Sequence, residues 1–155
     1  MRITQYKTKL TDDKKAVLEK EVSFNRPDLD RKMNSPEKIA YLGKYVLEMH
    51  KNAEEYLYML CMDNKLNLTS IFELSHGNVN SSIFSVREIL QKALLANAVS
   101  IVVMHNHPTG DPTPSKEDVD VSKRLAEAGK IVGIQLLDHI IIGDNYVSLK
   151  EKGYL

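Results

Sequence analysis

The stretch that most constrains the fold is AVSIVVMH, residues 98–105, which is apolar over the length of a strand with Ser100 as its one polar interruption before His105. A strand with one face in water alternates apolar and polar residues, whereas a continuous apolar run is typical of a strand that is buried on both faces. We therefore expect residues 98–105 to form a central strand in a sheet whose two faces are both covered.

The rest of the chain supplies helix and hairpin signals that fit such a sheet. Serines at N-cap positions mark three helix starts, at Ser35, Ser85 and Ser115, and we expect Gly129 to end the third helix. Two hairpins are indicated, one over residues 55–75 and one over residues 133–149. The order helix, hairpin, helix, strand, helix, hairpin predicts an α/β sandwich with a mixed central sheet.

Residues 1–33 precede the first helix signal and are predicted to be an N-terminal extension of one domain over residues 34–155. The segments YKTKL and AVLEKEVSF are compatible with two short strands around the polar TDDKK, and an irregular arm is the alternative. A chain of 155 residues suffices for one full core, so two domains with separate cores are not expected.

Charge and composition narrow the functional classes. The 21 Lys and Arg residues balance the 21 Asp and Glu residues, so the basic excess of a nucleic-acid-binding protein is missing. The single cysteine, Cys61, excludes an internal disulfide and a multi-thiolate zinc site, and it is expected to be a small buried hydrophobe. There is no apolar run near ~20 residues and no apolar core of a signal peptide, so we expect a soluble cytoplasmic protein without membrane contact.

Two histidines follow the apolar strand directly, in the segment His105-Asn106-His107. In a strand, residues two apart project from one face at ~6.6 Å, and two imidazoles at that spacing can converge on one metal ion. A proline-rich turn then leads to Asp118, in the first turn of the next helix. Two histidines and one carboxylate leave a fourth position for water, which is typical of catalytic zinc.

Each part of this pattern is weak by itself. Ser115 and Asp118 have the spacing of a helix capping box, and a bare H-x-H is not specific for metal. Other H-x-H sites do not fit: a metallo-β-lactamase needs Asp and His where this chain has Thr109 and Gly110, and a zinc nucleoside deaminase needs a downstream PCxxC. A cupin would be all-β. The combined spacing therefore predicts a metal site.

The segment HNHPTGDPTPSKED matches the JAMM signature of MPN+/JAB metallopeptidases, which is H-x-H, seven residues, S, two residues, D. From about Asn34 to Leu155 the chain resembles the bacterial RadC family. The resemblance implies a cytidine-deaminase-like, three-layer α/β/α core with Zn²⁺ held by His105, His107 and Asp118. It also implies that Ser115 stabilises an oxyanion and that a glutamate from an earlier strand is the general acid/base.

The general acid/base is expected to be Glu55, which heads the first strand of the hairpin as the family's glutamate does. Glu54 would face the other way, Glu73 lies within the second strand, and Glu88 is explained by its capping box. A solvated charge at the strand end is the alternative for Glu55. No Cys or Ser triad is needed, because a metal-activated water can attack the amide directly.

The leading hypothesis is thus a zinc-dependent metallopeptidase or isopeptidase that acts on a protein or peptide substrate. The alternatives are a non-catalytic MPN-type binding module and a DNA-repair-associated metalloprotein that acts on nucleic acid. Longer RadC proteins carry a helix-hairpin-helix motif, of which residues 1–33 show no sign. The sequence does not specify the oligomeric state.

Five further residues carry smaller predictions. Asp138-His139 is expected to be a strand-edge pair, with support of the metal ligands or contact with substrate as the alternative. Asn106 should face away from the metal and pin a neighbouring loop. His50 and His76 have no partner at metal-ligand spacing and are expected at the surface.

Overall fold

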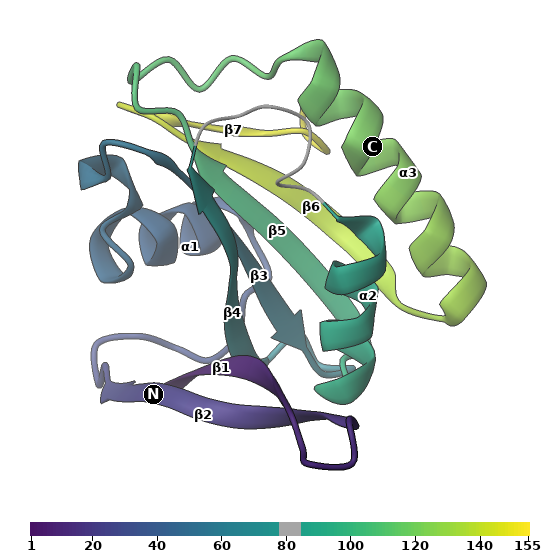
Figure 1. Cartoon of the computed structure of the whole chain (residues 1–155). Coiled ribbons are helices and arrows are strands. Elements are labelled where there is room, and N and C mark those ends of the chain that lie inside the picture. Colours follow the sequence, from purple (N-terminus) through teal and green to yellow (C-terminus); the bar gives the residue numbers. More distant parts are fainter. Residues whose placement is uncertain (78–84) are drawn as a thin grey trace.

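The computed structural model describes residues 1–77 and 85–155, which contain one mixed seven-stranded sheet of order β2-β1-β4-β3-β5-β6-β7 (Figure 1). Three antiparallel hairpins, β1–β2, β3–β4 and β6–β7, are joined through parallel β1–β4 and β5–β6 pairs and an antiparallel β3–β5 pair. The strands are β1 (Arg2–Leu10), β2 (Ala16–Asn25), β3 (Glu55–Met62), β4 (Leu68–Gly77), β5 (Ser100–Asn106), β6 (Gln135–Ile142) and β7 (Tyr146–Ser148).

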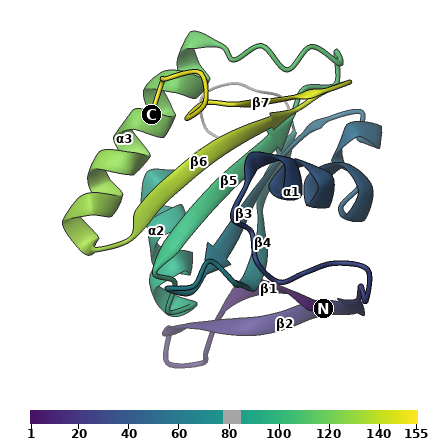
Figure 2. The same ribbon diagram turned by 180° about the vertical axis from the view of Figure 1, so that it is seen from behind.

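Helices cover both faces of this sheet, as Figures 1 and 2 show from opposite sides. One face carries α1 (Pro36–Tyr41), which continues into a π-helical segment, Leu42–Val46, and is followed by a 3₁₀ turn, Met49–Lys51. The other face carries α2 (Val86–Leu95) and α3 (Lys116–Val132). The predicted three-layer α/β/α sandwich with a mixed central sheet is therefore confirmed.

The strand β5 is buried along its whole length, as its apolar run predicts. Alternate side chains enter two different cores: Val102 and Met104 pack with the residues of α1, while Ile101 and Val103 pack with those of α2 and α3. This is the two-residue period of a strand between two helical layers. Cys61 lies in the second core, and burial raises the pKa of its thiol to about 12.

Local capping explains where the helices begin. The side chains of Ser35, Ser85 and Ser115 each accept a hydrogen bond from a backbone N–H in the first turn of the helix that follows. The predicted end of α3 was wrong: Gly129 lies within the helix, which runs to Val132, and Gly133 ends it with a positive φ of 78°. No helix in residues 1–77 and 85–155 has the length and apolarity needed to cross a membrane.

Within the first 33 residues, residues 2–25 form a regular hairpin of the sheet rather than an irregular arm. β1 and β2 form a hairpin longer than the two predicted segments, and β1 lies parallel to β4 with Gln5 opposite Ile71. The side chain of Ile3 is buried in the core beneath α1. The division of the chain at residues 33 and 34 stays a prediction, because the hairpin shares its sheet and part of its core with the rest of the chain.

Candidate metal centre

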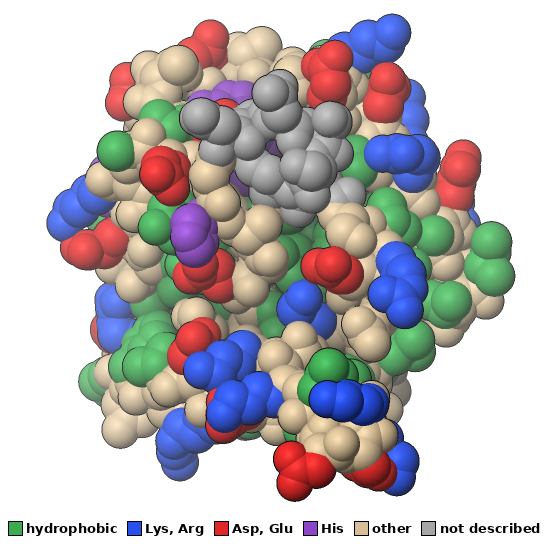
Figure 3. Space-filling model, viewed as in Figure 1, with side chains coloured by type: hydrophobic (Ala, Val, Ile, Leu, Met, Phe, Trp, Pro, Cys, Tyr) green, Lys and Arg blue, Asp and Glu red, His purple; other side chains and the backbone are tan. Residues whose placement is uncertain are grey.

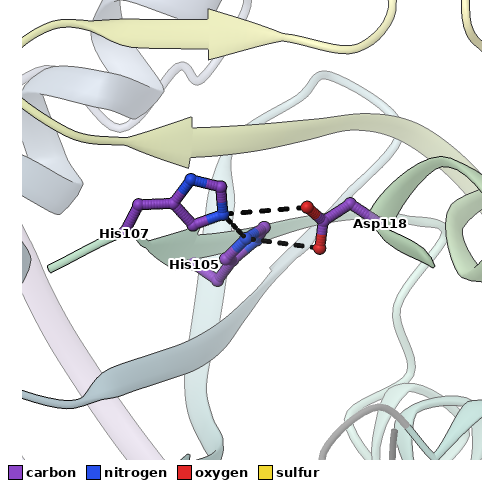
Figure 4. A group of neighbouring side chains, drawn as sticks. All are labelled: His105, His107 and Asp118. Carbon is purple, nitrogen blue, oxygen red and sulfur yellow. Dashed lines mark hydrogen bonds and ion pairs between the residues drawn. The ribbon is translucent and has the colours of Figure 1, made fainter. Parts of the chain in front are cut away.

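The side chains of His105, His107 and Asp118 converge at the carboxyl end of β5 (Figure 4). His105 is the second-last residue of β5, and His107 follows the strand, where its N–H donates to the carbonyl of Ile142 on β6. Asp118 comes from the first turn of α3. The group could hold a metal ion, because its three ligand atoms lie within 4.8 Å of one another.

The distances among these atoms fit a small tetrahedral ion. The two Nε2 atoms of His105 and His107 are 2.9 Å apart, and they lie 3.4 Å and 3.7 Å from the nearer Asp118 carboxylate oxygens. Two ligands at ~2.0–2.1 Å from zinc with a tetrahedral angle between them are about 3.3 Å apart. Shifts of about half an ångström would therefore bring all three atoms into coordination.

The charges of the three residues depend on one another. The hydrogen bond with Asp118 raises the pKa of His107 above its usual value, against the effect of burial. Burial alone would raise the pKa of Asp118, but the hydrogen bond with His107 and the positive charge of a protonated His105 hold it well below its usual range. Asp118 is therefore a carboxylate at neutral pH, which is the form that binds a cation.

Ser115 and Asp118 form the capping box that their spacing predicts. The Ser115 N–H and hydroxyl both donate to Oδ2 of Asp118, at 2.8 Å and 2.6 Å, while the N–H of Asp118 donates to Oγ of Ser115 at 3.1 Å. The capping role and a ligand role are compatible, because Oδ1 of Asp118 is the oxygen nearest to Nε2 of His105. In this arrangement the Ser115 hydroxyl points at a carboxylate rather than at a substrate position.

Glu55 lies beside the three residues, at the first position of β3. Leu57 of β3 pairs with His105, so Glu55 and His107 occupy corresponding positions two residues further along the antiparallel pair. Partial burial raises the pKa of Glu55, and the charges of His107 and Asp118 act on it in opposite directions. A carboxyl group with a raised pKa beside a candidate metal position is suited to proton transfer.

The other glutamates are placed elsewhere. Glu73 is opposite Tyr58, whose side chain packs in the core beneath α1, so it belongs to the sheet face away from His105, and it contacts the Tyr58 hydroxyl and His76. Glu54 is exposed. Glu88 follows the N-cap of α2 and donates its N–H to Ser85. Among these glutamates, Glu55 is the one whose charge acts on a candidate ligand, His107.

His139 is not a strand-edge residue, so that prediction was wrong. It is fully buried on β6, with Nε2 at 2.7 Å from Nδ1 of His105 and Nδ1 at 2.6 Å from the hydroxyl of Ser122 on α3. Burial keeps the pKa of His139 well below its usual value and lowers that of His105 to about 4. The sequence carried one signal for this contact, a lone histidine inside the apolar run LLDHIII.

Asp138, also buried, has a different role. Its carboxylate accepts hydrogen bonds from the backbone N–H groups of His139 and Lys150 and from the hydroxyl of Ser148. These contacts tie β6 to β7 and to the turn that follows it. The pair Asp138-His139 is thus split between a structural carboxylate and an imidazole that contacts a candidate ligand.

The loop after His107 is held by close backbone approach. Nδ1 of His107 lies 2.8 Å from the carbonyl oxygen of Asp111, and the N–H of Asp144 donates to the carbonyl of Gly110. Gly110 has a φ of 85°, and a Cβ on Gly143 would lie 2.2 Å from the Gly110 oxygen. Glycine is therefore required at both positions, and the turn between β6 and β7 sets where the His107 loop lies.

Asn106 points away from His105 and His107, as expected for alternate residues of a strand. Its side-chain amide accepts from the N–H of Tyr56 at 2.8 Å and donates to the carbonyl of Glu54 at 3.0 Å. Asn106 therefore pins the residues on either side of Glu55. His50 and His76 are both exposed, as predicted.

Known proteins share this region of the chain. The family profile described as RadC-like JAB domain matches residues 33–154. A UPF0758 protein of Desulfitobacterium hafniense (strain DSM 10664 / DCB-2) is 45% identical over 124 residues, which are 79% of this chain and 54% of that protein. A UPF0758 protein of Geobacillus sp. (strain WCH70) is 49% identical over 115 residues, which are 73% of this chain and 51% of that protein. A UPF0758 protein of Clostridium botulinum (strain Okra / Type B1) is 48% identical over 123 residues, which are 79% of this chain and 53% of that protein.

The chain spans about half the length of the curated relatives that it matches. The residues that the family profile matches, 33–154, contain strands β3 to β7 and all three candidate ligands. This agreement of sequence, fold and site leads to one conclusion: the chain belongs to the RadC-like JAB domain family.

Proposed function

We propose that this protein is a zinc-dependent hydrolase of the JAMM type, which cleaves a peptide or isopeptide bond with Glu55 as general acid/base. The observation that carries the proposal is the convergence of two imidazole Nε2 atoms and one carboxylate beside a partly buried glutamate. Three protein ligands of this kind leave room for water or substrate, as catalytic rather than structural zinc sites do.

His105, His107 and Asp118 would hold the ion through the atoms that already face one another. When bound, zinc makes a water ligand more acidic and polarises a substrate carbonyl. The negative charge of Asp118 and the neutral form of His105 that burial favours both suit a divalent cation.

Glu55 would take a proton on its carboxylate as water attacks the carbonyl and later deliver that proton to the leaving amine. Its raised pKa favours this double role, because a group that titrates closer to neutral pH both accepts and releases a proton readily. The Asn106 contacts to the backbone on either side of Glu55 would keep the carboxylate in position.

Ser115 would donate its hydroxyl to the developing oxyanion. Its proton now points to Oδ2 of Asp118, so this role requires a rotation of the hydroxyl towards substrate. Ser115→Ala should lower the rate and also remove a helix cap worth about 1 kcal/mol. Ser85→Ala, which removes the equivalent cap of α2, is the matched control for the loss of stability.

The test is a library of peptides and isopeptide-linked conjugates incubated with the protein, with and without a chelator, and after zinc is restored. We expect zinc-dependent cleavage that Glu55→Gln lowers by about 10²- to 10⁴-fold without loss of zinc, since general acid/base catalysis contributes that much. The exposed neighbour Glu54→Gln should cleave as the wild type does. Unchanged cleavage by Glu55→Gln, or loss of its zinc, would reject the role of Glu55.

A further inference from the structure

We infer that Ser122 and His139 form a hydrogen-bond relay that fixes the tautomer of His105, so that Nε2 of His105 faces the metal position as a lone pair. This inference deepens the proposed function and rests on it only for the nature of the cation. Both relay residues are fully buried, and neither belongs to the group of candidate ligands. They are positioning residues that act through His105.

The relay starts at the main-chain carbonyl of Asp118. The hydroxyl oxygen of Ser122, one helical turn later, lies 2.6 Å from this carbonyl oxygen and 2.6 Å from Nδ1 of His139. A carbonyl oxygen carries no proton, so the hydroxyl must donate to it. Ser122 has no second proton to give, and its oxygen must therefore accept a proton from Nδ1 of His139.

The same reasoning passes from His139 to His105. A neutral imidazole with its proton on Nδ1 has a lone pair on Nε2, and burial favours the neutral ring at His139. Nε2 of His139 lies 2.7 Å from Nδ1 of His105, so it accepts and Nδ1 of His105 carries the proton. Nε2 of His105 is then a lone pair directed towards His107 and Asp118.

The tautomer of His107 is fixed by a single hydrogen bond to the backbone. Its Nδ1 lies 2.8 Å from the carbonyl oxygen of Asp111, which can only accept, so Nδ1 of His107 carries a proton and Nε2 is the ring nitrogen left to bind a metal. Nε2 of His107 lies 2.9 Å from the lone pair on Nε2 of His105 and 3.7 Å from Oδ2 of Asp118, so without a cation it donates a proton into this hydrogen bond, and a metal ion would take the place of that proton. The contacts at the Nδ1 atoms of both rings therefore leave the two Nε2 atoms facing the metal position.

The relay also joins ligands that come from different elements. It begins at the backbone of Asp118 on α3, crosses β6 through His139 and ends at His105 on β5. Histidine ligands commonly donate their second N–H to an oriented acceptor, and loss of that acceptor typically weakens metal affinity by 10- to 100-fold. Here the acceptor is a second imidazole, which the ligand-bearing helix itself orients.

Three variants and one control separate this role from plain packing. Ser122→Ala removes the first link but keeps both rings, and His139→Leu removes the acceptor for His105. His139→Gln keeps an amide oxygen that can accept from Nδ1 of His105. The control is Ser100→Ala, on the same strand as His105, because the Ser100 hydroxyl is buried and has no hydrogen-bond partner among residues 1–77 and 85–155.

The first measurement is long-range ¹H–¹⁵N NMR of the metal-free full chain, which reports the ring nitrogen that carries the proton in each histidine. We expect His105 to be protonated on Nδ1 in the wild type and in Ser100→Ala, and to lose this single tautomer in Ser122→Ala and His139→Leu. This readout does not depend on hydrolysis. A protein with the expected tautomer and no peptidase activity would contradict the proposed function and leave the relay supported.

The second measurement is the zinc affinity of each variant by chelator competition. We expect Ser122→Ala and His139→Leu to bind zinc about 10- to 100-fold more weakly than the wild type, with most of the affinity restored in His139→Gln. If His139→Leu fails to fold, Ser122→Ala decides the question. A wild-type His105 protonated on Nε2, or a tautomer and zinc affinity unchanged in Ser122→Ala, would overturn the inference.

Discussion

Replacement of Gly143 by alanine should displace the loop that carries His107. The added Cβ would lie 2.2 Å from the carbonyl oxygen of Gly110 and 3.0 Å from the nitrogen of Pro112, where ordinary contacts begin near 3.4 Å. These are backbone atoms that cannot rotate away, so the loop must retreat by about 1 Å. Asp111, whose carbonyl contacts Nδ1 of His107, lies between the two atoms that must move.

Two losses should follow from Gly143→Ala. Overpacking should reduce the free energy of unfolding by about 1–3 kcal/mol. Loss of the oriented acceptor for His107 should also weaken zinc affinity by about tenfold or more. Urea denaturation measures the first loss, and chelator competition on the folded protein measures the second.

Gly129→Ala is the matched control, because its Cβ would lie 2.3 Å from the backbone oxygen of Ile134. The clash is of nearly the same size, but Gly129 is eleven residues after Asp118 in α3, or about 16 Å along the helix. We expect a similar loss of stability with unchanged zinc affinity. Wild-type zinc affinity in Gly143→Ala, or an equal loss in Gly129→Ala, would refute the link between this turn and the metal site.

Three other predictions follow from the site and the surface. Elemental analysis should find about one zinc ion per chain in the wild type and none in the His105→Ala/His107→Ala double variant, and equal metal in both would disprove the ligand assignment. Burial holds the folded-state pKa of His105 at about 4, below its unfolded value, so the unfolded chain binds this proton first and His105 contributes a loss of stability to the metal-free protein as the pH falls from 7.5 to 5. His105→Gln should remove about 2 kcal/mol of that loss in urea unfolding at the two pH values, and an equal loss in both proteins would contradict this pKa. DNA should bind with a Kd no lower than ~10⁻⁴ M at physiological salt, because Lys and Arg side chains are interspersed with Asp and Glu on the face seen in Figure 3. Sub-micromolar binding that weakens with salt in fluorescence anisotropy would argue instead for a nucleic-acid function.

Several features of the site were predictable from short stretches of sequence. The apolar run before His105 predicted a strand covered on both faces, and the spacing of His105, His107 and Asp118 predicted three side chains that meet. The serine caps were equally visible. These features depend on the two-residue period of a strand and on hydrogen bonds within one helical turn, so neighbouring residues are enough to specify them.

Other features depended on how distant segments pack. Gly129 and Gly133 are both reasonable helix ends in the sequence, and the return of the chain over Gly129 at Ile134 decides between them. The choice of Glu55 over Glu73 depends on which strand of the hairpin lies against β5 and on which face each side chain takes.

The relay through His139 shows the same limit most clearly. His139 lies 17 residues after Ser122 and 34 residues after His105 in the chain, and its contacts with both exist only because β6 lies parallel to β5 while α3 packs over both. The residues around each segment determined a buried strand, a capped helix and a ligand spacing. The register between β5 and β6 and the position of α3 on the sheet come from packing over the whole core. They determined that the buried imidazole of His139 contacts the candidate ligand His105.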